Sequence, residues 1–273
     1  MQEGDKMSAY DRIKLARDIN RPTAKKYIDV IIDDFMEFHG DRAFADDHAI
    51  IGGIGWLDNT AVTVIGIEKG TDMESKQFRG FGSALPEGYR KAQRLMFQAE
   101  KFKRPIICFV DTQGAACGSG AEQRGVGQSI ADNLAKMMTI KVPIITIIIG
   151  EGGSGGALGL AVADEVWMLE NSYYSVIAPE SCASILYKDP ERKDEAAESL
   201  HLFAENLLEL GIIEKIIAEP ENFTDADATE EFLLKLKEDL IRNIKRLSSK
   251  RVGQLLAARY EKFRKVGRYK EIG

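Results

Sequence analysis

The spacing of hydrophobic residues changes several times along the first ninety positions and divides this part of the chain into predicted elements. Residues 8–19 carry apolar side chains at helical spacing, and residues 22–40 open with proline and close with glycine, as a helix does. Two runs rich in β-branched residues then flank an Asp-Asn pair, which predicts a β-hairpin over residues 49–70. Residues 70–86 are polar and contain glycine, which indicates a surface loop.

From residue 86 onward, predicted helices and strands alternate. Each predicted strand is a nearly continuous apolar run, which is typical of parallel strands buried on both faces. Strands joined by helical crossovers predict an α/β fold. The predicted helices cover residues 86–103, 121–140, 155–164 and 190–211, and the predicted strands cover residues 105–111, 142–150, 165–170, 173–178 and 212–218. Two charged helices with a break near Ser248 and Ser249 are expected at the end.

Three parts are therefore expected: an N-terminal helical segment (1–45), an α/β core (46–220) and a C-terminal helical extension (221–273). The extension is basic, because residues 241–273 carry a charge of about +9 while the rest of the chain carries about −15. A basic helix of this kind is most often a solvated face. The alternative is a docking surface for an acidic partner or a phosphate-bearing substrate, and nucleic acid is a minor third option.

The composition indicates a soluble enzyme-sized domain. The chain has 273 residues, of which 44% are hydrophobic, and these can form one large core. We expect a cytoplasmic protein without a membrane span, because no run of about eighteen apolar residues and no apolar leader segment occur in the sequence. Few residues suit metal binding, disulfide formation or base catalysis: three cysteines without C-x-x-C spacing (Cys108, Cys117, Cys182) and three scattered histidines (His39, His48, His201).

The segment GEGGSGG, residues 150–156, follows a predicted buried strand and allows three interpretations. The first is a dinucleotide site of an NAD(P)-dependent oxidoreductase, since Gly150, Gly152 and Gly155 match G-x-G-x-x-G and Glu170 lies twenty residues after Gly150. Glu151 argues against it, because its carboxylate would lie beside a pyrophosphate. Two unit charges about 4 Å apart repel by about 4 kcal/mol at an effective dielectric constant near 20.

The second interpretation is a serine hydrolase, because Ser154 lies in a G-x-S-x-G pattern at a strand-to-helix turn. Such an enzyme needs a histidine further along the chain, and His201 is the one candidate. We expect His201 inside a helix whose buried stripe contains Leu200, Phe203 and Leu207, which favours a structural role for it.

The third interpretation uses only the backbone. Glycines at a helix start leave N–H groups that no helical carbonyl accepts, and such donors can stabilise an oxyanion that develops during a reaction. A second glycine-rich loop follows the strand that ends at Asp111 and adds donors around Gly114 and Ala115. Both loops are expected at the carboxyl ends of neighbouring strands, where α/β folds bind ligands. Tight packing of a helix on the sheet is the structural alternative for these glycines.

Long motifs resemble one protein family. FMEFHGDRAFADD, PEGYRKAQRLM, VPIITIIIGEGGSGGALGLAVAD, WMLENSYYSVIAPESCASILYKD and RYEKFRKVG are similar to the alpha subunits of bacterial acetyl-coenzyme A carboxylase carboxyltransferase, in the order of that family and from about Asp18 to Gly267. The resemblance implies a crotonase-like (ClpP/crotonase) spiral of ββα units. It also implies transfer of a carboxyl group from carboxybiotin on a carrier protein to acetyl-CoA, which gives malonyl-CoA for fatty-acid synthesis.

The resemblance further implies partners and site residues. The partners are a zinc-ribbon carboxyltransferase beta subunit in an alpha2beta2 heterotetramer, the biotin carboxyl carrier protein and, in the wider complex, biotin carboxylase; no metal is expected in this chain. The N–H groups of Gly155 and Gly156 would hold the biotin ureido oxygen. Gly114, Ala115, Gly152 and Gly153 would line the substrate pocket.

The second loop departs from the family pattern. Ala116 and Cys117 stand where the family commonly has Tyr-Pro, and Gln123 stands in place of a second acid. The loss of a bulky aromatic and of a fixed φ near the expected site predicts an effect on substrate preference. A divergent paralogue that carboxylates another acyl-CoA is therefore an alternative, as is an assembly subunit without activity.

Overall fold

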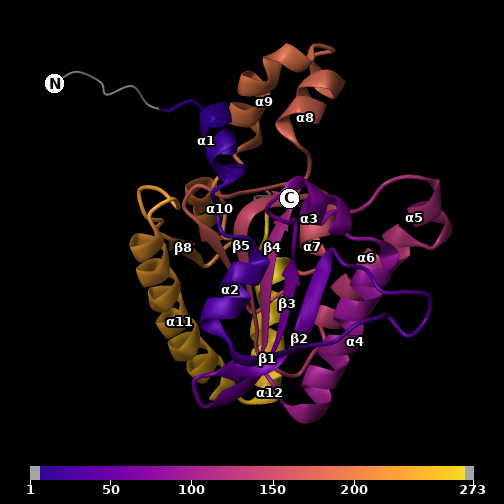
Figure 1. Cartoon of the computed structure of the whole chain (residues 1–273), viewed down its shortest axis with the longest axis vertical. Helices are drawn as coiled ribbons and strands as arrows, with labels where there is room; N and C mark the ends of the chain where they lie inside the picture. Colours follow the sequence, from indigo (N-terminus) through magenta and orange to yellow (C-terminus); the bar gives the residue numbers. More distant parts are fainter. Residues whose placement is uncertain (1–6, 268–273) are drawn as a thin grey trace, which may run out of the picture.

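One eight-stranded sheet forms the centre of the molecule (Figure 1). Its strand order is β1-β2-β3-β4-β5-β6-β8, and β7 pairs with β5 off this path. The first three strands are antiparallel, and the pairs from β3 onward are parallel. The computed structural model describes residues 7–267, with strands β1 Asp33–Glu37, β2 Ile50–Leu57, β3 Thr60–Ile67, β4 Ile106–Thr112, β5 Ile144–Gly153, β6 Glu165–Leu169, β7 Tyr173–Ser175 and β8 Lys215–Ile217.

Helices cover both faces of the sheet (Figure 1). Helices α2 and α11 pack against one face, and α4 and α6 pack against the other. The helices are α1 Ala9–Ala16, α2 Ala24–Ile31, α3 Met73–Phe78, α4 Pro86–Phe102, α5 Ser119–Gln123, α6 Val126–Met137, α7 Ser154–Leu158, α8 Pro179–Leu186, α9 Lys193–Leu200, α10 Ala204–Glu209, α11 Ala226–Ser248 and α12 Val252–Arg264, with 3-10 turns η1 Gly80–Gly82 and η2 Pro190–Arg192.

The central strands show why the chain forms a three-layer α/β fold. All seven residues of β4 are buried. Ile106, Cys108 and Val110 belong to the core under α4 and α6, whereas Ile107 and Phe109 belong to the core under α2 and α11. Successive side chains of a strand point to opposite faces, so an uninterrupted apolar run fills both cores. The predicted α/β class with a parallel, doubly covered sheet is confirmed.

The helix predicted over residues 22–40 is wrong in its second half. Helix α2 ends at Ile31, Ile32 is extended with φ −111° and ψ 118°, and Asp33–Glu37 form β1, which pairs with β2. This segment is an edge strand, so its acidic residues can face water and do not show the alternation of a half-buried strand. Pairing with β2 therefore outweighs the helical spacing seen in the sequence.

Three further boundaries differ from the sequence prediction. The expected surface loop over residues 70–86 contains α3 and η1, and a capping box between Asp72 and Ser75 begins α3. The helix expected over residues 121–140 is divided into α5 and α6 at Gly125, whose φ is +78°. The helix expected over residues 190–211 ends at His201, whose φ is +48°, and resumes as α10.

The basic C-terminal extension is packed into the same body. Helix α11 buries Phe232, Leu236 and Leu240 in the core under α2. The Arg259 side chain of α12 is fully buried and forms an ion pair with Asp164 at 2.7 Å. It also donates to the carbonyl oxygens of Met137 (2.5 Å), Ile140 (2.8 Å) and Val142 (3.1 Å). The expectation of a solvated basic face is therefore wrong for Arg259, which fixes the end of the chain to the sheet.

Two findings concern membrane-spanning helices and the cysteine residues. Among residues 7–267, no helix combines the length and the apolar character needed to cross a bilayer. Cys108 and Cys182 are buried free thiols, and Cys117 is an exposed one.

Candidate functional site

The two glycine-rich segments meet where β4 and β5 end side by side. Thr112 of β4 pairs with Gly152 of β5. A Cβ atom added to Gly153 would lie 2.2 Å from the Gln113 carbonyl oxygen, and one added to Gly156 would lie 2.5 Å from the Ala115 nitrogen. The loops therefore pack backbone against backbone, with no room for a side chain at either glycine. The predicted convergence of the two loops is present in the structure.

The predicted site residues differ in what their backbones can do. Gly152 and Gly153 belong to β5 and pair with Tyr174 and Ser175 of β7, so they form the buried floor of the site. Gly155 and Gly156 lie in the first turn of α7, which has no side-chain cap. N–H groups in this turn have no acceptor within their own helix. Gly155 is half-buried and Gly156 is buried.

The second loop contributes one free amide. The Gly114 N–H donates to Thr112 Oγ1 at 3.0 Å, and the Ala116 N–H donates to the Ala84 carbonyl oxygen at 2.9 Å. For the Ala115 N–H between them, the described part of the chain offers no hydrogen-bond acceptor. The amides of Ala115, Gly155 and Gly156 are thus among the donors that are available to a ligand at this edge.

Two buried side chains that the sequence interpretation missed hold α7 in place. The Tyr89 hydroxyl of α4 donates to the Gly156 carbonyl oxygen at 3.1 Å, and Asn133 Nδ2 of α6 donates to the Gly159 carbonyl oxygen at 3.2 Å. Burial raises the pKa of Tyr89, so its hydroxyl keeps the proton that it donates. Tyr89 lies three residues before Ala92 on the apolar face of its helix. Extending this apolar face by one turn toward the start of the helix would have identified Tyr89 as a buried residue.

Tyr89→Phe should lower the free energy of unfolding by about 1–3 kcal/mol, because the buried Gly156 carbonyl then loses its donor. Urea unfolding followed by circular dichroism measures this difference. Tyr260→Phe is a matched control, since Tyr260 is 53% exposed. The control should change stability by less than about 0.5 kcal/mol. Equal effects of the two substitutions would contradict a supporting role for the Tyr89 hydroxyl.

The dinucleotide interpretation does not fit this geometry. Gly150 and Gly152 are strand residues of β5 and do not form a phosphate-binding turn. Glu151 turns its carboxylate to Arg17 Nε at 2.8 Å and to the Tyr173 hydroxyl at 2.7 Å, which ties β5 to α1. The space that a pyrophosphate needs is therefore occupied by an internal ion-pair network.

The hydrolase interpretation also fails. Ser154 is exposed at the strand-to-helix turn, with φ +54°. His201 is not inside a helix, as the sequence suggested, but ends α9 in a left-handed conformation and is exposed. It lines a cavity with Arg12 and Glu205, whereas Ser154 lines a different cavity. A nucleophile and a base must lie within hydrogen-bond reach, and these two side chains belong to separate sites.

A buried ion pair lies behind the site. Asp111 of β4 is 1% exposed, its carboxylate pairs with Lys69 Nζ at 2.7 Å, and it accepts the Glu151 N–H at 2.9 Å. A Cβ atom on Gly150 would lie 2.6 Å from Asp111 Oδ1, so glycine is required there. The register between β4 and β5 shifts at this position, between Val110 and Thr112.

An apolar cavity of about 590 Å³ adjoins Gly155. Its wall contains Ser154, Gly155, Leu158, Tyr174, Val176 and Phe263. The volume falls within the range of roughly 300–1,000 Å³ that small-molecule sites occupy. A ligand here can combine apolar contact with hydrogen bonds from backbone donors at one end.

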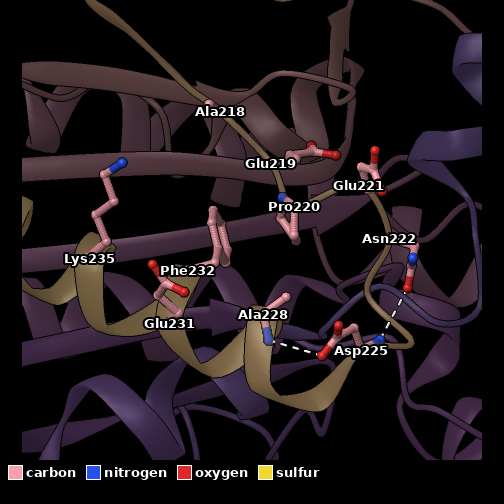
Figure 2. A pocket seen from close by; sticks show the side chains of 10 residues that line it. All are labelled: Ala218, Glu219, Pro220, Glu221, Asn222, Asp225, Ala228, Glu231, Phe232 and Lys235. Atoms are coloured by element: carbon pink, nitrogen blue, oxygen red, sulfur yellow. Dashed lines mark hydrogen bonds between the residues drawn. The ribbon is translucent and has the colours of Figure 1, made fainter.

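A second cavity, of about 450 Å³, lies between the segment after β8 and the start of α11 (Figure 2). Glu219, Glu221 and Glu231 contribute carboxylates to its wall, and Lys235 is the one cationic residue among those that line it. Glu219 is also bound to Arg21 at 2.7 Å. An acidic wall repels a phosphorylated substrate, so this cavity is a poor candidate for the catalytic site.

Residues 2–267 match the protein family described as acetyl co-enzyme A carboxylase carboxyltransferase-like. The acetyl-coenzyme A carboxylase carboxyl transferase subunit alpha of Clostridium acetobutylicum is 53% identical over 271 residues, which cover 99% of this chain and 98% of that protein. A relative from Natranaerobius thermophilus, named for subunits beta/alpha, is 54% identical over 272 residues, which cover 99% of this chain. This chain spans 44% of that longer relative.

Solved structures show the same fold at low identity. The transcarboxylase 12S hexamer core superposes with a TM-score of 0.65 at 17% identity, over 84% of this chain and 44% of the other. A Pseudomonas malonate decarboxylase hetero-tetramer in complex with coenzyme A gives a TM-score of 0.62 at 16% identity, over 77% of this chain and 84% of the other. The crotonase-like fold implied by the sequence resemblance is confirmed. The chain belongs to the acetyl co-enzyme A carboxylase carboxyltransferase-like family.

Proposed function

We propose that this chain is the carboxyltransferase alpha subunit of acetyl-CoA carboxylase and takes part in transfer of a carboxyl group from carboxybiotin to acetyl-CoA, which gives malonyl-CoA. The observation that carries the proposal is the full-length match to the Clostridium acetobutylicum alpha subunit, at 53% identity and 98% coverage of that protein. The fold supports it as well, because a structural neighbour with the same fold was solved with coenzyme A.

The site fits a biotin ring in two respects. Biotin carries one ureido carbonyl on an otherwise largely apolar bicyclic ring, and it therefore needs hydrogen-bond donors at one end and apolar walls around the rest. The amides of Gly155 and Gly156 supply the donors, and the cavity beside Gly155 supplies the walls. Carboxybiotin, when bound, supplies the carboxyl group that is transferred.

In this proposal, the protein contributes main-chain dipoles to the reaction. Gly155 and Gly156 donate to the ureido oxygen, and the Ala115 N–H lies beside them as a third donor. Donors that are fixed before the reaction stabilise developing negative charge, and each is typically worth about 2.7–4 kcal/mol. The packing of Gly156 against the Gly114–Ala115 backbone fixes their relative positions.

We propose a beta subunit as the second half of the active site, in an alpha2beta2 heterotetramer that works with the biotin carboxyl carrier protein and biotin carboxylase. The Natranaerobius relative supports this partnership, because it combines beta and alpha subunits in one chain and this chain covers 44% of it. The zinc ribbon expected in the partner and a cytoplasmic location stay predictions.

The loop around Ala116 and Cys117 bears on substrate choice. Cys117 is exposed, and Gly118 beside it has a φ of +119°. This surface lies next to the Ala115 amide, so it can contact the acyl-CoA. Acetyl-CoA is the proposed acceptor because of the high identity to alpha subunits named for that enzyme. Activity with another acyl-CoA is the alternative that the loop favours.

The proposal is tested by reconstitution with a beta subunit from a close relative. The assembled complex should decarboxylate malonyl-CoA in the presence of free biotin, and malonyl-CoA should react faster than methylmalonyl-CoA. Size-exclusion chromatography establishes that the subunits have assembled. An assembled complex without turnover on either substrate would contradict the proposed activity, and a preference for methylmalonyl-CoA would favour the paralogue.

A further inference from the structure

The apolar cavity beside Gly155 has a wall that comes from the far end of the sequence. Phe263 of α12 and Val266, which follows that helix, line it together with Gly155 and Leu158 of α7 and Tyr174 of β7. Phe263 is half-buried against the core under α4 and α6, and Val266 is 41% exposed. Helix α12 therefore reaches the cavity that Gly155 lines.

This wall is held rigidly by polar contacts on both sides of the helix. Arg259, one turn before Phe263, is 1% exposed and bound to Asp164. Lys262 pairs with Glu214 at 2.7 Å and donates to the Ala163 carbonyl oxygen at 3.3 Å. Since both cations are anchored in the protein body, they fix the last turns of α12, which carry Phe263.

We propose that Phe263 and Val266 form the apolar wall of the site for the biotin ring, so that the C-terminal helix determines how tightly biotin binds. This inference rests on the proposed function. Gly155 is at once a lining residue of the cavity and a free donor, so a ring whose carbonyl oxygen accepts that hydrogen bond extends into the apolar space. The acidic cavity of Figure 2 is less suitable, because the carboxylates of Glu219 and Glu221 lie in its wall and, among the residues that the structure describes, no glycine lines it.

The chemistry of the wall agrees with this ligand. Leu158, Val176 and Phe263 offer dispersion contacts to the hydrocarbon and thioether part of the ring, while the exposed Ser154 adds a hydroxyl group for its polar edge. Among residues 7–267, those that line this wall include no lysine or arginine. The wall of these residues therefore favours an uncharged ring over a coenzyme A phosphate.

Three substitutions test the inference in the complex with the beta subunit. Phe263→Ala removes the aromatic wall, and Val266→Trp fills the cavity from its exposed rim. Tyr260→Ala is the matched control, because Tyr260 lies on the same helix, is 53% exposed and does not line the cavity. Binding of free biotin is measured directly by saturation-transfer NMR, and the KM values for biotin and malonyl-CoA are measured separately.

Phe263→Ala should weaken biotin binding and raise the KM for biotin by roughly tenfold, as expected from loss of much of the apolar burial of one large side chain. Val266→Trp should raise the KM for biotin to a similar extent, because the indole ring occupies the space that the biotin ring needs. The KM for malonyl-CoA should stay unchanged, which a general structural defect would not produce. Tyr260→Ala should leave both KM values unchanged. Val266→Trp keeps the test valid if Phe263→Ala fails to fold.

The outcomes separate this inference from the proposed function. Suppose that the complex turns over malonyl-CoA and that both Phe263→Ala and Val266→Trp keep the wild-type KM for biotin. This result would overturn the inference but would not contradict the proposed function. Equal increases of both KM values would also overturn it. A wild-type complex that neither binds biotin nor turns over malonyl-CoA would instead overturn the proposed function.

Discussion

Gly156→Ala should lower malonyl-CoA decarboxylation by the reconstituted complex by about 10²–10³-fold, the size of effect that loss of one oxyanion donor produces. The added Cβ atom would lie 2.5 Å from the Ala115 nitrogen and 2.7 Å from the Gly114 carbonyl carbon. Both are backbone atoms, so the two loops must separate, which moves the Gly156 amide relative to the Ala115 amide. The same strain should cost about 1–3 kcal/mol of stability.

Gly155→Ala is the matched control one residue earlier. A Cβ atom on Gly155 would contact only the Ile130 side chain, at 3.8 Å, which is an ordinary van der Waals distance. This variant should keep its stability and most of its turnover, because an alanine retains the N–H group. Initial rates per folded complex, with thermal unfolding of each variant, give the comparison. Equal rates for the two alanine variants would show that the packing of Gly156 against the second loop does not support catalysis.

Arg259→Met should lower the free energy of unfolding by about 3–5 kcal/mol, the usual cost of removing one partner of a buried ion pair. The Asp164 side chain is 3% exposed and would lose its ion-pair partner. Three backbone carbonyls, those of Met137, Ile140 and Val142, would lose a donor at the same time. Urea unfolding of the purified chain measures the loss.

Two further variants make this measurement specific. Arg264→Met removes an exposed arginine from the same helix and should change stability by less than about 0.5 kcal/mol. The double variant Arg259→Met/Asp164→Asn should recover part of the loss, because no charge is then left buried and the Asn can still accept the Ile144 N–H that Asp164 binds at 2.8 Å. A loss for Arg259→Met no larger than that for Arg264→Met would mean that the ion pair does not fasten α12 to the sheet.

The central strands could be predicted because each has an apolar run within its own sequence, and such runs recur along the chain. Residues 106–110 and 144–149 are apolar at every position except Thr146, which is typical of strands buried on both faces. The segment Asp33–Glu37 could not be predicted in this way, since its strand character comes from pairing with β2 at the sheet edge. A charged edge strand carries no periodic signal of its own.

For the site, the sequence predicts where the two glycine-rich loops lie, but it does not show which of their backbone N–H groups lack a hydrogen-bond acceptor. Adjacent glycine-rich segments after neighbouring strands predict convergence at one edge of the sheet. Which N–H group is free depends on single contacts, such as that of Thr112 Oγ1 with the Gly114 N–H. The inward position of Arg259 was equally hidden, because a lone arginine in a basic helix is usually solvated. Which N–H groups are free and where Arg259 points both depend on contacts with other segments of the chain. The spacing of residues within one segment gives no information about such contacts.

The ion pair between Arg259 and Asp164 joins residues that are 95 positions apart. During synthesis at about 5–20 residues per second, the ribosome needs on the order of 5–20 s to add those residues. Throughout that interval the nascent polypeptide has an uncompensated carboxylate at the base of β5, and its sheet lacks the final helix. Translation that stops before residue 259 would leave this defect in place permanently, so prematurely terminated products should be recognised by chaperones and proteases.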